Sequence, residues 1–158
     1  MIEMSAAEIN GLLNAAHVGR IAMATPGGEP YVIPMPFCWH DGAIYLRLPD
    51  RGRKAAILRE NDRVCFEADT YADDLSDYAS VLIEGRLVPV SDLSEKARVK
   101  KANDEKYLRL RRGFRPGHQR PVSLSELPLQ KILISELSGR KKEPRATAVV
   151  SGSATKEE

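Results

Sequence analysis

The chain is poor in cysteine, and that shortage excludes two classes of protein. Among its 158 residues there are two cysteines, Cys38 and Cys65, and they do not form a C-x-x-C pair. A disulfide framework and a cysteine-based zinc site are therefore not expected. We interpret both cysteines as small core residues in a protein of the reducing cytosol.

Long apolar runs and targeting signals are also missing. No stretch reaches the roughly 20 apolar residues that a membrane-spanning helix needs. The N-terminal residues Met1 to Ser5 have neither the basic start nor the apolar core of a secretory signal. We expect a cytoplasmic protein that does not enter a membrane.

Several binding motifs are absent as well. The chain contains neither G-x-G-x-x-G nor G-x-x-x-x-G-K-[ST], so the Rossmann and P-loop modes of phosphate binding are excluded. Its three histidines are scattered, and the acidic stretch from 69 to 77 lacks the spacing of an EF-hand loop, so no metal site is expected. A formal net charge of +2 is too small to indicate nucleic-acid binding by itself.

The apolar pattern that is present predicts a mainly β (α+β) protein. Six runs are typical of strands, at 18–25, 31–39, 43–48, 63–68, 80–90 and 129–137. Short turns join several of them, which favours a small six-stranded antiparallel β-barrel with peripheral helices. Within the fifth run, Gly85 indicates a bulge or a close backbone approach.

Helices are expected beside the barrel. Ser5 and Glu8 fit a capping box before a short amphipathic helix, and residues 53–60 are good helix formers after Gly52. A surface helix from 93 to about 112 should turn Leu93, Ala97, Ala102 and Leu108 inward. We expect one domain over 1–143, an irregular segment at 114–128, and a polar, disordered tail over 144–158.

The most informative stretch runs from Tyr31 to Lys54. Its two strands meet at a His40-Asp41-Gly42 turn, and the first carries Pro34 and Pro36 at the strand period of two. The two missing N–H groups fall on one edge, so the amides of Ile33, Met35 and Phe37 should remain available on the other. Such a row of donors suits a planar heterocycle with carbonyl and ring-nitrogen acceptors, such as a flavin.

Basic residues follow directly after the second strand. Arg47, Arg51, Arg53 and Lys54 lie within eight residues around Gly52, at the start of a predicted helix. Guanidinium and ammonium groups hold a phosphate dianion through charge-assisted hydrogen bonds, and helix first-turn amides add to this. A ring site beside a phosphate site predicts a mononucleotide.

The same residues resemble those of the pyridoxamine 5′-phosphate oxidase-like flavoproteins, and the nitroimidazole-resistance branch is the most similar. The resemblance covers roughly residues 5 to 137 and depends on ordered short motifs. They are Val18-Gly19-Arg20-Ile21-Ala22, Pro30-Tyr31-Val32-Ile33-Pro34, Asp41-Gly42-Ala43-Ile44-Tyr45, Gly52-Arg53-Lys54, Asn61-Asp62-Arg63-Val64-Cys65-Phe66-Glu67, and Ser80-Val81 with Gly85.

The resemblance implies an FMN-binding split barrel that forms a homodimer with the flavin at the interface. The implied cofactor-binding residues are Val32, Ile33, Pro34, Met35, Pro36, Phe37, Arg47, Leu48, Arg53, Lys54 and Ser80. The nitroimidazole-resistance branch commonly has His-Ser where this chain has Arg47-Leu48, which removes a candidate imidazole. We expect no catalytic side chain, and chemistry carried by the flavin towards a small-molecule substrate.

Other interpretations of these patterns stay open. The prolines could only protect an edge strand, and the basic loop could be a solvated surface. A non-enzymatic carrier of flavin is an alternative to an oxidoreductase, and related barrels accept a deazaflavin or heme. The basic stretch from Lys106 to Arg120 interleaves Tyr107 and Phe114 with arginines, which is compatible with RNA or polyphosphate binding or with pairing to an acidic loop of a partner subunit.

Overall fold

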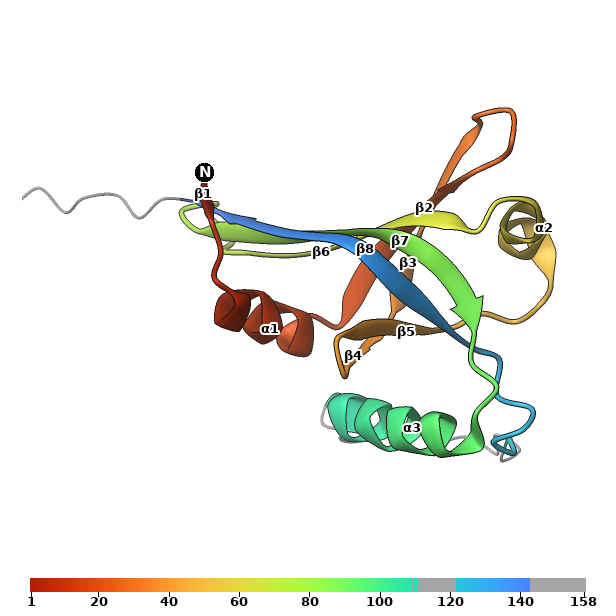
Figure 1. Ribbon diagram of the computed structural model, residues 1–158. Coiled ribbons are helices and arrows are strands. Elements are labelled where there is room, and N and C mark those ends of the chain that lie inside the picture. The colour runs from red at the N-terminus through yellow and green to blue at the C-terminus, as the bar shows by residue number, and fades with distance from the viewer. Residues whose placement is uncertain (109, 111–121, 143–158) are drawn as a thin grey trace, which may run out of the picture.

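The computed structural model describes residues 1–108, 110 and 122–142 (Figure 1). The predicted tail, the helix beyond residue 108 and most of the basic stretch lie outside these residues. The strands and helices, in chain order, are β1 (Ile2–Glu3), α1 (Ala6–Ala15), β2 (Val18–Ala24), β3 (Pro30–Pro36), β4 (Cys38–His40), β5 (Ala43–Arg47), α2 (Gly52–Glu60), β6 (Arg63–Tyr71), β7 (Tyr78–Pro89), α3 (Leu93–Leu108) and β8 (Leu129–Lys141).

All strands belong to one curled antiparallel sheet. Its order is β3-β2-β6-β7-β8-β5-β4, and β1 pairs with β8 beside this path. The two end strands, β3 and β4, are consecutive in the chain and are separated only by Phe37. The sheet is therefore closed by a bend of the chain at Phe37 and not by a ladder of hydrogen bonds, which makes it a split barrel.

The fold class expected from the sequence is confirmed, and the strand count over the described residues is corrected from six to eight. The run expected at 31–39 is divided at Phe37 into β3 and β4, because the segment pairs first with β2 and then with β5. The short β1 adds the other strand by pairing with the end of β8. β6 and β7 also extend further than expected, so the acidic stretch is a strand end and a hairpin turn.

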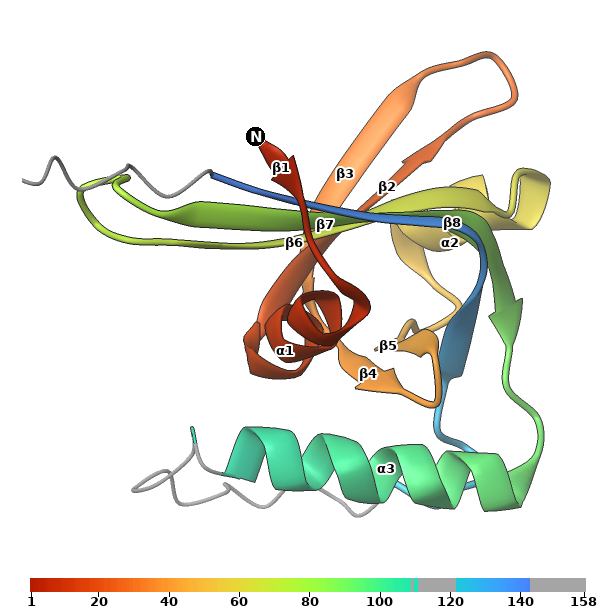
Figure 2. The same cartoon turned by 60° about the vertical axis from the view of Figure 1, so that its left-hand side comes forward.

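The core lies inside the curled sheet, with α1 packed against one end of it (Figure 2). Ile9, Leu12 and Leu13 are the buried face of α1. The predicted capping box is present: the Glu8 amide donates to the Ser5 hydroxyl, and the Ser5 amide donates to the Glu8 carboxylate. At the centre, the rings of Phe37 and Phe66 pack edge to face with centroids 4.9 Å apart.

Gly85 marks a bulge, as the sequence predicted. The β7–β8 register shifts between Glu84 and Gly85, so that Gly85 faces Ile134. A Cβ atom at this position would overlap the backbone carbonyl of Leu133. Only glycine fits so close to a neighbouring backbone.

The expected inward face of α3 was wrong at Leu93, Ala97 and Leu108, which are exposed, and confirmed at Ala102, which is partly buried against the core. Leu93 and Leu108 are 54% and 70% exposed, whereas Val99, Tyr107 and the aliphatic part of Lys96 are buried. Lys96 is accommodated because its ammonium donates to the carbonyls of Ser125 and Leu127. The sequence of α3 has no clear apolar stripe, so its buried residues could be identified only from the tertiary contacts of the helix. No helix among the described residues is long and apolar enough to cross a membrane.

Candidate functional site

The bend at Phe37 brings the ends of β3 and β5 together at the split in the barrel. Cys38 pairs with Tyr45 in the β4–β5 hairpin, so Pro36 and Arg47 lie on the two sides of the same opening. A cavity of about 210 Å³ occupies this place. Its lining includes Met35, Pro36 and Arg47, three of the residues expected to bind a cofactor.

The hydrogen bonds of β3 correct the expected row of free donors. β3 pairs with β2 along its whole length. Because prolines cannot donate, the paired amides of this ladder are those of Tyr31, Ile33 and Met35. The amide of Phe37 is also engaged, since it donates to the Tyr107 hydroxyl at 2.9 Å.

The free edge of β3 is therefore the edge with the missing proline N–H groups. The opposite edge, which was expected to be free, pairs with β2. Residues 30, 32, 34 and 36 direct their backbone groups away from β2, and three of them are prolines. This edge presents carbonyl oxygens and the single amide of Val32. The side chains alternate too: Tyr31, Ile33 and Met35 pack against the core, whereas the other side chains of β3 are exposed.

The start of α2 lies beside the first half of β3. The Arg53 guanidinium sits over the Tyr31 ring, with Cζ 4.6 Å from the ring centroid. The first turn of α2 contains no acidic residue, and Gly52 has a φ of 80° that lets the chain turn into the helix. Leu48 and Lys54 line a separate hollow of about 180 Å³ together with Asp50 and Arg59.

Ser80 lies apart from the other predicted cofactor residues. It belongs to β7, three strands from β3 in the sheet, where it pairs with Asp69 and Arg140. The expected contact set therefore forms two groups within one chain. β3, β5 and α2 hold eight of its residues, Phe37 and Leu48 directly follow β3 and β5, and β7 holds the eleventh.

A charged cluster between β3 and β7 was not predicted from the sequence. Arg20 of β2 forms ion pairs with Glu67 and Asp69 of β6 on the outer face of the sheet. Burial and the neighbouring Asp69 raise the pKa of Glu67, while Asp69 and Glu67 raise the pKa of Arg20. The alternation of residues along β2 and β6 would have placed these charges on the outer face, but only the pairing register could join them.

Two residues at the end of α3 were also missed. The Tyr107 hydroxyl accepts from the Phe37 amide and lies 2.7 Å from the carbonyl oxygens of His17 and Phe37. Lys106 donates to the carbonyls of Leu13 and Phe37, and its ammonium lies 3.9 Å from the Phe37 ring centroid. Tyr107 is 9% exposed, so it does not offer the stacking surface that RNA binding would need.

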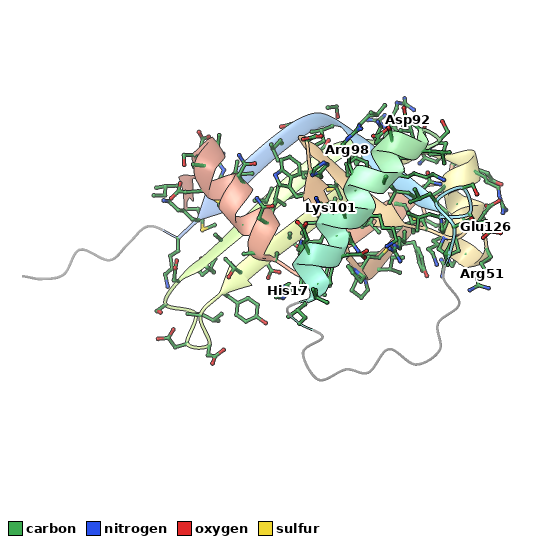
Figure 3. All side chains as sticks on the ribbon, turned by 90° about the horizontal axis from the view of Figure 1, so that it is seen from below. His17, Arg51, Asp92, Arg98, Lys101 and Glu126 are labelled. Carbon is green, nitrogen blue, oxygen red and sulfur yellow. The ribbon has the colours of Figure 1, made fainter. Side chains whose placement is uncertain are left out.

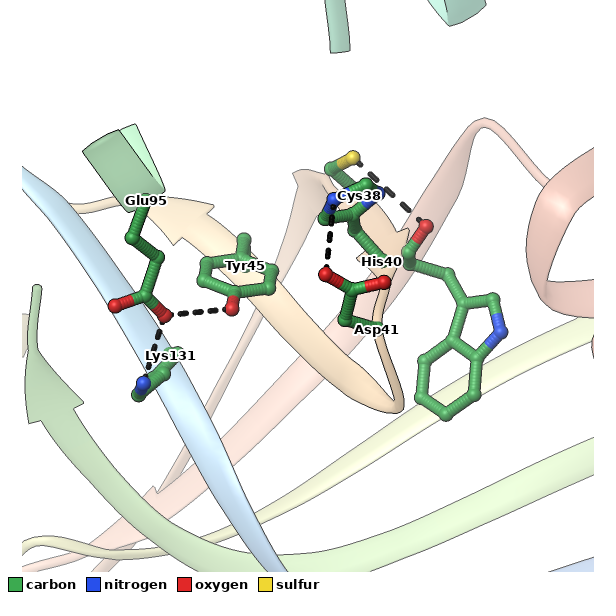
Figure 4. A network of polar contacts seen from close by, with 7 residues as sticks. Cys38, His40, Asp41, Tyr45, Glu95 and Lys131 are labelled. Carbon is green, nitrogen blue, oxygen red and sulfur yellow. Dashed lines mark hydrogen bonds and ion pairs between the residues drawn. The ribbon is translucent and has the colours of Figure 1, made fainter. Parts of the chain in front are cut away.

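Two of the titratable side chains that line the cavity, Cys38 and Tyr45, have raised pKa values, which favours their protonated forms. Burial raises the pKa of the Cys38 thiol, although the Lys106 ammonium opposes this effect. Burial and the Glu95 carboxylate raise the pKa of Tyr45, whose hydroxyl donates to Glu95 at 2.7 Å (Figure 4). His40 lies near Cys38 in the same view, and its Nε2 is 3.3 Å from Asp41 Oδ2.

Comparisons with solved structures match this chain over most of its length. A FAD-binding protein from Mesorhizobium loti is 29% identical, with a TM-score of 0.65 and coverage of 90% of this chain and 98% of that one. A candidate 5-nitroimidazole antibiotic resistance protein from Bacteroides thetaiotaomicron is 19% identical, with a TM-score of 0.66 and coverage of 90% of both chains. The FAD-binding protein from Mycobacterium smegmatis is 20% identical, with a TM-score of 0.66 and coverage of 89% and 98%.

At 19% and 20% identity, the last two comparisons show the fold alone. No curated protein matches the sequence. The pyridoxamine 5′-phosphate oxidase family model matches residues 5–141, which include every strand from β2 to β8 and all three helices. The chain therefore belongs to the pyridoxamine 5′-phosphate oxidase family.

Proposed function

We propose that this protein binds FMN and acts as an oxidoreductase on a small molecule. The observation that carries the proposal is the contact of Arg53 with Tyr31. It brings the basic start of α2 next to β3, the strand that leads to Met35, Pro36 and the cavity. A phosphate site and an apolar surface for a ring are thus joined on one side of the barrel.

The comparisons support a flavin as the cofactor. Two of the structures with the same fold are described as FAD-binding proteins, and the Mesorhizobium loti protein shares 29% of its residues with this chain. FAD and FMN have the same ring, ribityl chain and first phosphate. We favour FMN because Arg51, Arg53 and Lys54 form one basic cluster at the start of α2, which suits one phosphate group.

The residues fit this cofactor in a way that differs from the first expectation. Arg53, Lys54 and the first-turn amides of α2 would bind the phosphate. The carbonyls on the free edge of β3 would accept the N–H of an oxidised flavin ring, and the Val32 amide would donate to one of its acceptors. When bound, the flavin supplies hydride or electron transfer, and the chain positions it.

We also propose that the protein works as a homodimer with the flavin at the interface. The outer face of β2, β3, β6 and β7 carries the exposed side chains of Val18, Val32 and Leu82, which are 45%, 60% and 44% exposed. The small side chains of Ala22 and Ala24 border an open depression of about 830 Å³ on the same face. A second copy packed here would bury these groups and could bring its own Ser80 towards β3.

The phosphate site can be tested with the double variant Arg53→Ala/Lys54→Ala. Charge-assisted hydrogen bonds contribute about 1.5 to 3 kcal/mol each, so FMN binding should weaken by several kcal/mol. Flavin fluorescence titration measures the affinity. Arg59→Ala, on the last turn of the same helix and paired with Asp50, is the matched control and should bind FMN normally.

Unchanged FMN affinity in the double variant would reject the assignment of the phosphate site. The visible spectrum of the purified protein then separates the cofactor alternatives, because a flavin absorbs near 450 nm and a heme gives a Soret band. Anaerobic reduction of the FMN-loaded protein, followed by addition of an oxidant, separates an enzyme from a carrier. An enzyme re-oxidises its bound flavin faster than the same oxidant re-oxidises free reduced FMN, whereas a carrier gives no such acceleration.

A further inference from the structure

In Figure 2 α3 lies below the β4–β5 hairpin, and residues of both elements line the cavity at the split of the barrel. Its apolar walls come from three parts of the chain: the β4–β5 hairpin, α3, and the segment leading into β8. The buried residues among them are Cys38, Tyr45, Val99, Tyr107, Leu127 and Leu129. Each is at most 9% exposed, so the walls are packed from behind.

The helix over this cavity is held in place at both ends. At its first turn, Glu95 accepts hydrogen bonds from the Tyr45 hydroxyl and the Lys131 ammonium, each at 2.7 Å (Figure 4). At its last turn, the Tyr107 hydroxyl bonds to the backbone of Phe37 and His17. Figure 3 shows α3 crossing this side of the molecule, with His17 beside its C-terminal end. The space between these attachments is therefore a built cavity and not a gap left by loose packing.

The charged side chains that line the cavity are both positive. Arg47 stands on the β5 side, and Lys100 and Asn103 stand on the α3 side. Val99, Lys100, Asn103 and Tyr107 line the cavity at helical spacing, so one face of α3 provides them all. No carboxylate belongs to the lining among the described residues. Asp104 pairs with Lys100 at 2.6 Å but does not line the cavity.

The volume of the cavity limits the size of the ligand that can enter it. An apolar cavity of about 150 Å³ holds benzene, so about 210 Å³ suits one aromatic ring with a small substituent. A three-ring flavin is larger than this space, and the proposed phosphate residues Arg53 and Lys54 do not line it. Met35, Pro36 and Arg47 belong both to the cavity and to the proposed flavin contacts, so an occupant would lie next to the flavin.

We propose that this cavity is the substrate pocket and that it takes a single aromatic ring carrying a carboxylate, with Lys100 and Asn103 selecting the anionic group. The assignment of the occupant as a substrate rests on the proposed flavin function. The ring would be buried against Val99, Leu127 and Leu129. The carboxylate would lie at the rim, where Lys100 attracts it and the Asn103 amide can donate to it.

The test compares benzoate with benzamide, which have nearly the same shape and differ in charge. Each is titrated into isotopically labelled, FMN-loaded protein, and amide chemical shifts report both the site and the affinity. Benzoate should shift the signals of Val99, Lys100 and Asn103 and bind about tenfold more tightly than benzamide, as expected for one charge-assisted hydrogen bond. Equal affinities, or shifts confined to other regions, would overturn the proposal.

Two neighbouring lysines provide a matched pair of variants. Lys100→Met should remove most of the preference for benzoate, whereas Lys101→Met, on the next position of the same helix and exposed, should keep it. Asp104→Asn frees the Lys100 ammonium from its ion pair and should strengthen benzoate binding severalfold. Loss of the preference in both lysine variants would show that the helix contributes only general charge, and would contradict the selection by Lys100.

The substrate assignment and the proposed flavin function can be rejected independently of each other. If FMN binds through Lys54 but benzoate does not enter the cavity, the proposed function stands and the substrate assignment is wrong. If benzoate binds to the protein without FMN and no flavin binds at all, the proposed function fails and the cavity is a ligand site but not a flavoenzyme's substrate pocket. Binding of FMN and binding of benzoate are both measured on the same labelled protein.

Discussion

The ammonium of Lys106 is surrounded by carbonyl oxygens and an aromatic ring. Most half-buried lysines instead contact a carboxylate. It donates to Leu13 and Phe37, and the Phe37 ring lies beneath it. Burial lowers its pKa from 10.5 to about 8, against the opposing effect of a charged Cys38. The folded protein therefore releases this proton at lower pH than the unfolded chain does.

The sign of the resulting pH dependence follows from proton counts. Below pH 8 both states hold the proton, and burial of the charge opposes folding. Between about pH 8 and 10.5 the unfolded state binds more protons, so this lysine makes stability rise with pH. Lys106→Met should remove that rise. Urea unfolding from pH 7 to 10 measures it as the difference between the two proteins.

Cys38 and Tyr107 also titrate in this range, and burial raises the pKa of both. Their effect has the opposite sign, and the Lys106 ammonium lowers the pKa of Cys38, so both proteins also carry Cys38→Ala and the difference between them then reports Lys106. If the stabilities of the two proteins change in parallel with pH, the lowered pKa of Lys106 is contradicted.

Gly85 is a second residue whose identity is set by a single close approach. Gly85→Ala places a methyl group against the Leu133 carbonyl and must separate β7 from β8. Such overpacking costs about 1 to 3 kcal/mol. Gly11→Ala is the control, because its side chain would meet open space within α1 and should stabilise by about 0.5 to 1 kcal/mol. Urea midpoints that fall equally in both variants would refute the close approach as the cause.

At the scale of elements, α3 shows how a helix without a clear apolar face is positioned by polar contacts. The distribution of apolar residues along α3 predicts a solvated helix, and the leucines at its two ends are exposed. Glu95 and Lys96 fix its first turns to β5, β8 and the segment before β8. Tyr107 fixes its last turn to the bend at Phe37. The cavity depends on both attachments.

Tyr107→Phe tests the attachment at the C-terminal end of the helix. It removes the acceptor of the Phe37 amide and the single O–H donor that lies between the carbonyls of His17 and Phe37, while the ring stays buried. An unsatisfied buried group costs about 1 to 3 kcal/mol, so the free energy of unfolding should fall by that amount. Hydrogen exchange of the Phe37 amide should also accelerate.

Tyr71→Phe is the matched control, since Tyr71 is 61% exposed. It should change stability by less than about 0.5 kcal/mol. A Tyr107→Phe protein as stable as this control would show that the hydroxyl does not hold α3.

At the scale of the whole molecule, the outer face of the sheet is the surface on which we propose that two copies of the chain meet. It combines exposed Val32 and Leu82 with small residues and the Arg20 cluster. Leu82→Asp should convert the proposed homodimer into a monomer, because an unpaired carboxylate would be buried in the interface. Analytical ultracentrifugation measures the mass in solution. FMN affinity should fall with dimer dissociation if both subunits contact the flavin.

Leu93→Asp serves as the control for this change. Leu93 is 54% exposed on the first turn of α3, away from the outer face of the sheet, and its substitution should leave the dimer intact. A monomeric wild-type protein, or a dimer that survives Leu82→Asp, would contradict the proposed interface.

Local patterns in the sequence determined much of this protein. Alternating apolar residues specified the strands, Ser5 and Glu8 specified the start of α1, and Gly85 specified the bulge, because each of these features depends on neighbours along the chain. The ordered motifs specified the family. The division of residues 30–40 into two strands was not predicted, because it depends on which distant strand pairs with each half.

Only the tertiary structure decided how the prolines of β3 act. The sequence showed that their missing N–H groups share an edge, but not that β2 occupies the other edge and takes the amides of Ile33 and Met35. It also could not show that Tyr107, seventy residues away, bonds to the Phe37 amide. Spacing along a strand fixes which groups share an edge, whereas the partners at that edge come from segments whose positions are set by packing of the whole chain.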